Sequence, residues 1–496
     1  MLKKNRAIVV ASGFLLIFCL LLARLVQIQL VSTESYSNHQ INLIEESVNQ
    51  RVQSIALDDG RGKFYDQSGE PIDHEQVATL ILFPFLDNMK WPIEKLADII
   101  GVSSSEIKTT LANAKEPFVF ERNNKAIVLS ERQMEDINEL KIPGVFATNR
   151  ILPLKKHLAE QLIGGLTRSA DIKKKRYGDR QLPAMTMVGD KGLQEQLDAY
   201  LLSEGESRLV YHVDGIGGPL FGINVKYLSP GNELYPVRVI TTLDKKLQQA
   251  AEDIVDSSEY GIKKGGFIII DIESSEIRAS VSRPSIDQKD PNKGVGAKNL
   301  MLTQATLGSV FKTIVSAAAI EEQMVNPNTS YNCNRQFDGT LNTNRPLGYL
   351  NFYDSFSQSC NKTFSDLAIN LSNKDPDLLE AYAKKLQLVG KSGWSGDIFH
   401  SSVTQLFGEE NGQIWLKDSE DKKDARLIAQ TAIGQQNVQA TPLAVANMMA
   451  TIARNGEKKL VKAVSSIEYA NGTTAAVFKN QDIKGDTIIL LQQLKN

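Results

Sequence analysis

The N-terminus carries an uncharged apolar run, and this feature constrains the fold of the chain more than any other. Residues 7–23 contain no charged side chain, and Lys3, Lys4 and Arg6 precede them. This length is at the short end of the ~17–25 residues of a membrane-spanning helix. The apolar pattern continues past Arg24 without a small-x-small cleavage site, which favours a retained anchor over a cleaved signal peptide. We therefore expect the basic flank in the cytoplasm and the chain after about residue 32 outside.

Composition describes an ordinary folded protein and excludes several functional classes. Of the 496 residues 42% are hydrophobic and 23% are charged, and the formal net charge is −2. Because no basic field results, binding to nucleic acid is not expected. Cys19 lies in the apolar run, and we do not expect a disulfide between Cys333 and Cys360. The five histidines are scattered without metal-ligand spacing, so neither a metal site nor a histidine-based triad is predicted.

The second half of the chain shows the pattern of an α+β domain. Residues 265–272 form a continuous apolar run and are predicted to be a buried strand, with residues 277–281 returning as its hairpin partner. Residues 309–323 and 443–454 are apolar and predicted to be helices. Strands followed by buried helices around one sheet indicate an α+β domain from about residue 236.

Ser309 and Lys312 stand at the start of the alanine-rich helix. Side chains three residues apart on a helix share one face and can touch. Burial in an apolar interface disfavours the ammonium form of lysine, so a neutral Lys312 could accept the hydroxyl proton of Ser309. This pairing makes a nucleophile without histidine. Backbone N–H groups at the helix N-terminus could also stabilise a developing oxyanion.

The Ser-x-x-Lys spacing by itself is weak evidence. Only Ser309 begins a long apolar helix soon after a β-hairpin, with Gly308 permitting close approach of the backbone. Elsewhere the spacing is interpreted as that of surface pairs. It recurs at Ser105 and Lys108, at Ser359 and Lys362, and at Ser419 and Lys422.

A second polar pair, Ser359 and Asn361, follows further along the chain. A hydroxyl and an amide two residues apart on a loop could both point into one cleft. The hydroxyl could relay a proton, and the amide could hold the lysine and bond a substrate amide. The alternative interpretation is a loop serine and asparagine that make only local turn bonds.

Together these pairs resemble the serine penicillin-recognising superfamily, in which Ser-x-x-Lys is followed by Ser-x-Asn and then by Lys-Thr-Gly. Residues 299–312 are similar to the nucleophile signature of that family, with Leu307 where proline is usual and Val310 where threonine is usual. Further elements resemble class B penicillin-binding proteins in family order. They are residues 61–69, residues 189–194 with Gln194 in place of glutamate, residues 241–248 and residues 434–443.

The resemblance implies a role for each candidate residue. Ser309 would be the nucleophile and Lys312 the general base, while Ser359 would relay protons and Asn361 would position substrate. The implied reaction is peptidoglycan D,D-transpeptidation through an acyl-serine, with β-lactams trapped covalently at the same serine and no cofactor. The implied partners are peptidoglycan stem peptides, the cell membrane, and a glycosyltransferase or other proteins of the division or elongation machinery.

The third family motif is not found where the resemblance requires it. Lys391, Ser392 and Gly393 match it literally, but they precede the helix at residues 443–454, whereas the family places the motif after that helix. In context this segment resembles the glycine-rich loop of the family. Residues 482–496 are interpreted as the helix just before the motif. We therefore expect a transpeptidase domain that is incomplete at its C-terminus.

The expected architecture is α+β and multi-domain. It comprises a cytoplasmic tail at residues 1–6, a single transmembrane anchor at 7–31, an extended α+β pedestal of the dimerisation type at 32–235, and an incomplete αβα-sandwich transpeptidase domain at 236–496. The favoured function is that of a peptidoglycan D,D-transpeptidase. The alternative is an inactive, truncated relic that acts as a wall-associated scaffold, which the missing third motif favours. A soluble β-lactamase is a weaker third hypothesis, because an anchor and pedestal have no role there.

Overall fold

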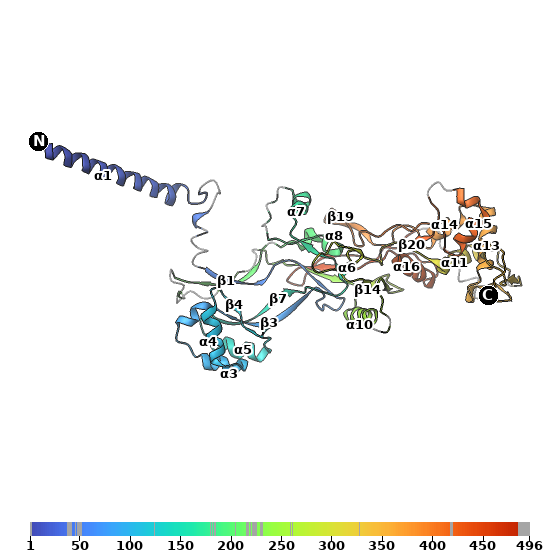
Figure 1. Cartoon of the computed structure of the whole chain (residues 1–496), viewed down its shortest axis with the longest axis horizontal. Coiled ribbons are helices and arrows are strands. Elements are labelled where there is room, and N and C mark those ends of the chain that lie inside the picture. The colour runs from blue at the N-terminus through green and yellow to red at the C-terminus, as the bar shows by residue number, and fades with distance from the viewer. Residues whose placement is uncertain are drawn as a thin grey trace. The chain divides into compact units, whose positions relative to one another are not determined.

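The computed structural model of the chain is drawn in Figure 1. It describes residues 2–36, 42–44, 46, 52–123, 125–178, 180, 182, 185–203, 205–214, 218, 220, 226–228, 232–257, 259, 261–326, 328–416 and 420–484. Contacts divide the chain into two compact units. The first comprises Met1–Asp59, Gln76–Leu152 and Gly205–Pro230, and the second comprises Gly60–Glu75, Pro153–Glu204 and Gly231–Asn496. Each unit is therefore assembled from three separate stretches of the chain.

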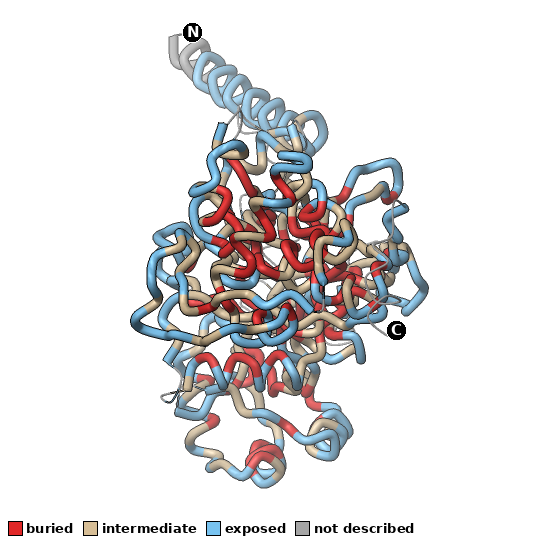
Figure 2. Tube along the Cα trace, turned by 90° about the vertical axis from the view of Figure 1, so that its right-hand side faces the viewer, coloured by how far each residue is buried: buried red, intermediate tan, exposed pale blue. Residues whose placement is uncertain are grey.

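The apolar N-terminal run forms a helix, as predicted. Helix α1 spans Leu2–Val26 and continues as a single π-helical turn, η1, at Gln27–Val31. Within the part of the chain that the structure describes, Ile8–Val31 is the one helix whose length and composition suit a membrane span, and none of its most apolar window is buried. Figure 2 shows this helix as an exposed rod. An apolar helix with exposed side chains is the form that a bilayer-embedded segment takes.

The first unit contains two small antiparallel sheets. Strands β1 (Val52–Asp58), β10 (Ser207–His212) and β11 (Lys226–Leu228) form one, in that order. Strands β4 (Phe118–Val119), β3 (His74–Leu82) and β7 (Val145–Pro153) form the other. A short hairpin, β5 (Glu121–Arg122) and β6 (Lys125–Ala126), follows β4. The remaining elements are η2 (Pro84–Asn88), α3 (Ile93–Ile100), α4 (Ser104–Asn113) and α5 (Glu131–Glu139).

Helix α3 illustrates how sequence spacing builds the core of this unit. Ile93, Leu96, Ala97 and Ile100 are buried, at the helical spacing that places them on one face. Gly101 ends the helix at φ 67°, a left-handed conformation that glycine adopts without a Cβ penalty. The apolar face therefore packs inward and the chain turns directly afterwards.

In the second unit, a four-stranded sheet joins segments that are far apart in sequence. Its order is β2 (Lys63–Tyr65), β12 (Arg238–Thr241), β21 (Val464–Glu468) and β22 (Thr474–Val477), and β12 runs parallel to β2 but antiparallel to β21. Phe64, Val239 and Ile467 are buried in the core beside this sheet. The same unit contains a series of short elements. They are α6 (Glu160–Ile163), β8 (Leu166–Thr167), α7 (Ala170–Tyr177), β9 (Val188–Gly189), α8 (Gly192–Gln196) and α9 (Asp198–Leu201).

Arg61 connects two of the sequence elements that resemble class B penicillin-binding proteins. Its guanidinium is buried and donates to Gln194 Oε1 at 2.7 Å and to Asp198 Oδ1 at 2.8 Å. Gln194 stands where the family resemblance leads one to expect glutamate. Asp198, about one helical turn later, supplies the carboxylate instead and also accepts from the amide of Gly189 at 2.7 Å. The buried charge is therefore compensated by a residue that the sequence pattern did not single out.

The remainder of the second unit consists of a hairpin and a helical core. Strands β13 (Gly265–Ile270) and β14 (Ile277–Arg283) pair antiparallel, with α10 (Lys245–Asp256) packed against β14 and α16 (Pro442–Ala453) against β13. The main helices are α11 (Lys312–Glu321), α13 (Asn361–Lys374), α14 (Leu378–Lys385) and α15 (Ala425–Ala432). The shorter elements are η3 (Val295–Ala297), β15 (Ala305–Thr306), η4 (Gly308–Phe311), β16 (Tyr331–Asn332), β17 (Tyr349–Leu350), α12 (Phe352–Ser357), β18 (Ser395–Ile398), β19 (Ser401–Thr404), η5 (Glu420–Lys423) and β20 (Gln439–Ala440).

These elements confirm the α+β, multi-domain class and correct two details. Strand β13 is half-buried along its length rather than buried, and within the described residues β14 is its only partner strand. The helix expected at residues 482–496 lies outside the described residues from 485 onward. Asp482 itself pairs with Lys459 in an antiparallel bridge, so the start of that segment is extended rather than helical.

Candidate active site

Two glycines set the position of Ser309. Gly308 has φ 56°, and its amide donates to the carbonyl of Gly434 at 2.9 Å. A Cβ on Gly434 would lie 1.8 Å from the carbonyl oxygen of Gly308, so the two backbones meet at a distance that only glycine allows. Strand β15 runs into this turn and pairs with β20, which follows Gly434. Two segments far apart in the sequence therefore hold the turn that presents Ser309.

Ser309 and Lys312 occupy consecutive turns of different type. Ser309 lies in η4, a 3-10 turn, and α11 begins at Lys312, whereas the sequence pattern predicted one helix from Ser309 onward. Such 3-10 turns are frequent at the N-termini of α-helices. Ser309 is exposed, but Lys312 is only 2% exposed. The serine is thus open to an incoming ligand while the lysine points into the protein.

The ammonium nitrogen of Lys312 lies at the centre of a polar cluster. Lys312 Nζ lies 3.2 Å from Ser309 Oγ, 2.8 Å from Ser359 Oγ and 2.6 Å from Asn361 Oδ1. It also donates to the carbonyl oxygen of Ser359 at 2.8 Å. Ser359 Oγ in turn lies 3.0 Å from Ser309 Oγ. The structure therefore brings together the four residues that the sequence singled out, and each hydroxyl is within proton-transfer distance of the lysine nitrogen.

Burial changes the acidity of the lysine. Removal from water lowers the pKa of Lys312 to about 8, and the nearby positive charge of Arg345 acts in the same direction. Both effects disfavour the ammonium form, because burial removes its hydration and a like charge repels it. A useful fraction of Lys312 is therefore neutral near neutral pH, which a general base requires.

The turn between α12 and α13 positions Ser359 and Asn361. Ser359 has φ 56°, which is uncommon for a residue with a side chain. Its amide donates to the carbonyl of Phe356 at 3.0 Å, and the amide of Cys360 donates to that of Ser355 at 2.8 Å. Asn361 is the first residue of α13. Backbone strain of this kind is typical of functional turns that the surrounding structure holds in place.

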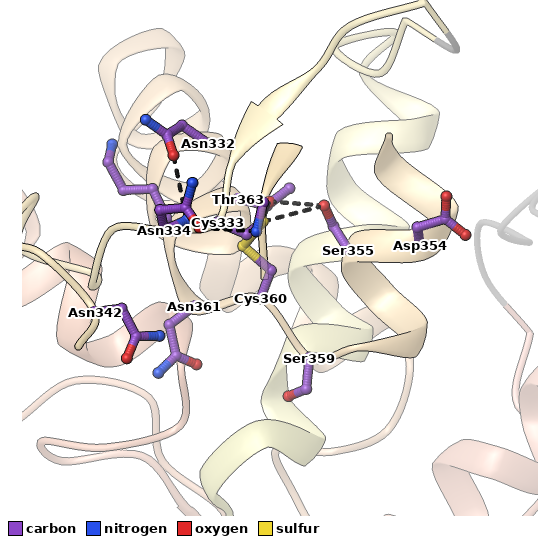
Figure 3. The surroundings of a disulfide bond; sticks show 12 residues. Asn332, Cys333, Asn334, Asn342, Asp354, Ser355, Ser359, Cys360, Asn361 and Thr363 are labelled. Atoms are coloured by element: carbon purple, nitrogen blue, oxygen red, sulfur yellow. Dashed lines mark hydrogen bonds between the residues drawn. A yellow bond between two sulfur atoms is a disulfide. The ribbon is translucent and has the colours of Figure 1, made fainter. Parts of the chain in front are cut away.

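A disulfide between Cys333 and Cys360 corrects the sequence expectation. The two Cα atoms are 5.8 Å apart, and Cys360 lies between Ser359 and Asn361 (Figure 3). The expectation was wrong because the hairpin of β16 and β17 folds back onto α13, which no local pattern reveals. Cysteine at the middle of the Ser-x-Asn motif was the one available signal. In Figure 3, Ser355 and Thr363 line the far side of the disulfide from Ser359.

The other matches to the family spacing lie elsewhere. Lys362 bonds Asp366 on its own helix, and Lys422 bonds Asp377 and Glu380. Ser105 is in α4 of the first unit, and Ser419 lies outside the described residues.

The literal Lys-Ser-Gly match at residues 391–393 is likewise not part of the cluster, and its Ser392 and Gly393 are buried while Lys391 is exposed. Ser392 is fully buried, and the amides of Ser392 and Gly393 donate to the carboxylate of Glu409 at 2.9 to 3.0 Å. Gly393 also pairs with Val461 in a parallel bridge. Among the described residues, none of these contacts involves the cluster around Lys312.

Two family models match the chain. The penicillin-binding protein transpeptidase domain matches residues 265–494, and the penicillin-binding protein dimerisation domain matches residues 58–236. The chain belongs to the class B penicillin-binding proteins.

Among curated proteins, the chain is similar to two named peptidoglycan D,D-transpeptidases. It is 26% identical over 301 residues to PbpA of Mycobacterium tuberculosis, which covers 54% of this chain and 57% of PbpA. It is 21% identical over 494 residues to MrdA of Escherichia coli, covering 92% of this chain and 73% of MrdA. The matched region thus spans a little over half the length of PbpA.

Solved structures share the fold. One, from a study of the coordination of polymerization and crosslinking by a peptidoglycan synthase complex, has a TM-score of 0.57 at 23% identity and covers 98% of this chain and 83% of its own. Penicillin-binding protein 2X of Streptococcus thermophilus has a TM-score of 0.54 at 18% identity, with coverage of 88% and 64%.

Proposed function

We propose that this chain is a serine-type peptidoglycan D,D-transpeptidase. The observation that carries the proposal is the cluster in which Lys312 Nζ, Ser309 Oγ and Ser359 Oγ lie within 3.2 Å of one another around a buried lysine of lowered pKa. An exposed hydroxyl beside a neutral amine is the arrangement that activates serine without histidine. The curated relatives that share these domains bear the name of this activity.

The contacts support an acylation step in which every proton has a path. Neutral Lys312 takes the proton of Ser309 Oγ, and the oxygen attacks the carbonyl carbon of the penultimate D-alanine of a stem peptide. The tetrahedral intermediate collapses by breaking the carbon–nitrogen bond to the terminal D-alanine. The leaving amine receives the proton from the Lys312 ammonium through Ser359 Oγ. Asn361, bonded to Lys312, keeps that nitrogen aligned with both hydroxyls.

The second half-reaction uses the same groups in reverse. An amine of a neighbouring stem peptide attacks the acyl-serine and loses a proton through Ser359 to Lys312, and Ser309 Oγ leaves with the returned proton. A β-lactam acylates the same oxygen by ring opening, but its leaving nitrogen stays tethered, so the acyl-enzyme persists. No cofactor enters either step.

The location of the reaction follows from the helix at the N-terminus. We propose that α1 spans the membrane once with its basic flank in the cytoplasm, which puts the remainder of the chain beside the peptidoglycan. Peptidoglycan glycan strands are made by glycosyltransferases, and one structural neighbour comes from a complex that couples polymerization to crosslinking. We accordingly propose a glycosyltransferase as the protein partner.

Labelled penicillin provides the test. The full chain in detergent micelles is expected to bind it covalently, and mass spectrometry is expected to locate the adduct on Ser309. Ser309→Ala should abolish labelling, whereas Ser105→Ala, which alters another serine of the same spacing, should leave it intact. An adduct on any other serine would contradict the assignment. A folded chain that takes no label would favour the scaffold hypothesis instead.

A further inference from the structure

An open apolar groove lies beside the helix that begins at Lys312. The groove has a volume of about 330 Å³ and is formed by α11, α12 and α16 of the second unit. Three of its large side chains are about half exposed, Tyr353 at 55%, Phe356 at 47% and Met449 at 50%. A contiguous apolar surface of this kind marks a place where another segment or molecule binds. Because Thr313 lines the groove, its occupant would contact the residue next to Lys312.

One polar group of the groove lacks a hydrogen-bond partner. Ser316 lines the groove and is only 8% exposed, and its hydroxyl makes no hydrogen bond to any residue that the structure describes. A buried hydroxyl without a partner costs free energy, so native proteins almost always pair such a group. The groove is therefore incomplete in two respects, because its apolar surface is uncovered and its hydroxyl is unpaired.

The described part of the chain ends close to one end of this groove. The amide of Ile483 donates to the carbonyl of Lys458 at 2.9 Å, and the two segments run antiparallel. The carbonyl of Glu457 in turn accepts from Nε of Arg454, the C-cap of α16, at 2.9 Å. The chain after Ile483 is therefore directed toward the C-terminal end of α16. The last turn of that helix contains Ile452, which lines the groove.

The sequence that follows, residues 485–496, is rich in large aliphatic side chains. Five of its twelve residues are of this kind, namely Ile488, Ile489, Leu490, Leu491 and Leu494. The match to the transpeptidase-domain model continues to residue 494, so this sequence is part of the domain. Twelve residues can extend about 40 Å, whereas the twelve residues of α16 rise about 18 Å. The segment is therefore long enough to follow the groove.

We propose that residues 485–496 dock in the groove of α11, α12 and α16 and cover Ser316. Docking removes the aliphatic side chains of the segment and the half-exposed side chains of the groove from water, which is stabilising. Backbone groups of the segment also supply a partner for the hydroxyl of Ser316. The docked segment holds α11 in place and so supports the position of Lys312. This inference does not rest on the proposed function.

Cross-linking tests which molecule occupies the groove. In the full chain with Cys19→Ser, in detergent micelles, Met449→Cys is combined in turn with Leu491→Cys and Leu494→Cys, and a short bismaleimide is added. At least one pair should cross-link within a single chain, which mass spectrometry identifies as a linked peptide pair in protein of monomer size. Phe407→Cys, which is 59% exposed and lies outside the groove, should not link to either position. Absence of any link to Met449→Cys would overturn the proposal. Links only between two chains would also overturn it and would assign the groove to a second copy.

A second measurement follows the rate at which a maleimide labels Met449→Cys in the same background. Leu490→Ser with Leu491→Ser should raise this rate roughly tenfold, because a cover that binds weakly leaves the groove open more of the time. Lys495→Ser is the control within the segment and should leave the rate unchanged. An unchanged rate in the double variant would contradict docking. An equal rise at Phe407→Cys would contradict it too, because it would show that the whole unit loosens.

Discussion

Lys312 Nζ lies 2.6 Å from Asn361 Oδ1, closer than it lies to either serine hydroxyl of the site. The amide oxygen therefore holds the nitrogen without adding a charge, and the pKa of Lys312 stays near 8. A neutral contact at this position is consistent with a base that must lose its proton before it can act.

This contact gives a pH prediction. Acylation should rise with pH through a midpoint near 8, because only the neutral amine of Lys312 accepts a proton. In Asn361→Asp a carboxylate stabilises the ammonium, which raises the pKa of Lys312 and should move the midpoint up by about one unit or more. The measurement is the acylation rate against pH, with Asn373→Asp on the exposed face of α13 as control. A midpoint that stays or falls would contradict the assignment of Lys312 as base.

Removal of the base itself gives a larger effect. Lys312→Ala should slow acylation by roughly 10²–10⁴-fold, the usual contribution of a general base. Since Lys312 is buried, part of any loss could be structural, so thermal unfolding of the same sample is measured beside the rate. A variant with the unfolding profile of the original chain and an unchanged rate would eliminate Lys312 from the mechanism.

The disulfide should contribute to stability and to activity together. Its cysteines are 27 residues apart, and closing a loop of that length in the unfolded chain corresponds to about 3–4 kcal/mol. Cys333→Ser with Cys360→Ser should lower the free energy of unfolding by about that amount and slow acylation. Denaturant unfolding with and without reductant measures the first effect. Cys19→Ser, which alters a free cysteine, is the control. An unfolding transition that changes neither with reductant nor with the double substitution would contradict the presence of the disulfide.

The buried pair of Arg61 and Asp198 should be sensitive to loss of either partner. Both side chains are almost fully buried and 2.8 Å apart, and Asp198 also pairs with Arg176 at 2.8 Å, so loss of the Asp198 carboxylate removes a buried counter-charge at a cost of about 3–5 kcal/mol. Asp198→Asn is expected to lower the unfolding free energy of the chain by that order. Asp136→Asn breaks the exposed contact to Arg132 and should cost about 1 kcal/mol or less. Equal effects of the two substitutions would show that burial does not decide the outcome.

The membrane topology can be tested directly. With α1 as a single span, protease added to protoplasts should digest the chain after residue 32, and the fragment that remains with the cells should contain α1. If the whole chain is protected until the membrane is dissolved, the chain after residue 32 lies on the cytoplasmic side and the proposed orientation is wrong.

The sequence predicted the residues whose arrangement depends on local geometry. Ser309 and Lys312 are one helical turn apart, and Ser359 and Asn361 flank a single residue, so spacing alone brings each pair together. The meeting of the two pairs followed only from the family resemblance. Their roles remain predictions, but the structure places all four within one hydrogen-bonded cluster.

What the sequence could not reveal depends on how distant segments meet. The partner of Cys360, the position of Arg345 and the use of Asp198 in place of a family glutamate all arise from folded contacts between separate stretches. The prediction that β13 is a buried strand was wrong for a related reason. The apolar run of β13 predicted burial, but the burial of a strand depends on the elements that cover it. Within the described residues, those elements leave β13 only half-buried.

The disulfide beside Ser359 also determines at what stage after synthesis the candidate site is completed. Glutathione and thioredoxin keep thiols reduced in the cytosol, and disulfides form in oxidising compartments. In the proposed topology the chain reaches an oxidising compartment only after export, so the turn that carries Ser359 gains its covalent tether there. Under the proposed function, Ser309 would then become fully reactive only outside the cytoplasm, where crosslinking takes place. Peptidoglycan precursors in the cytosol would not acylate it.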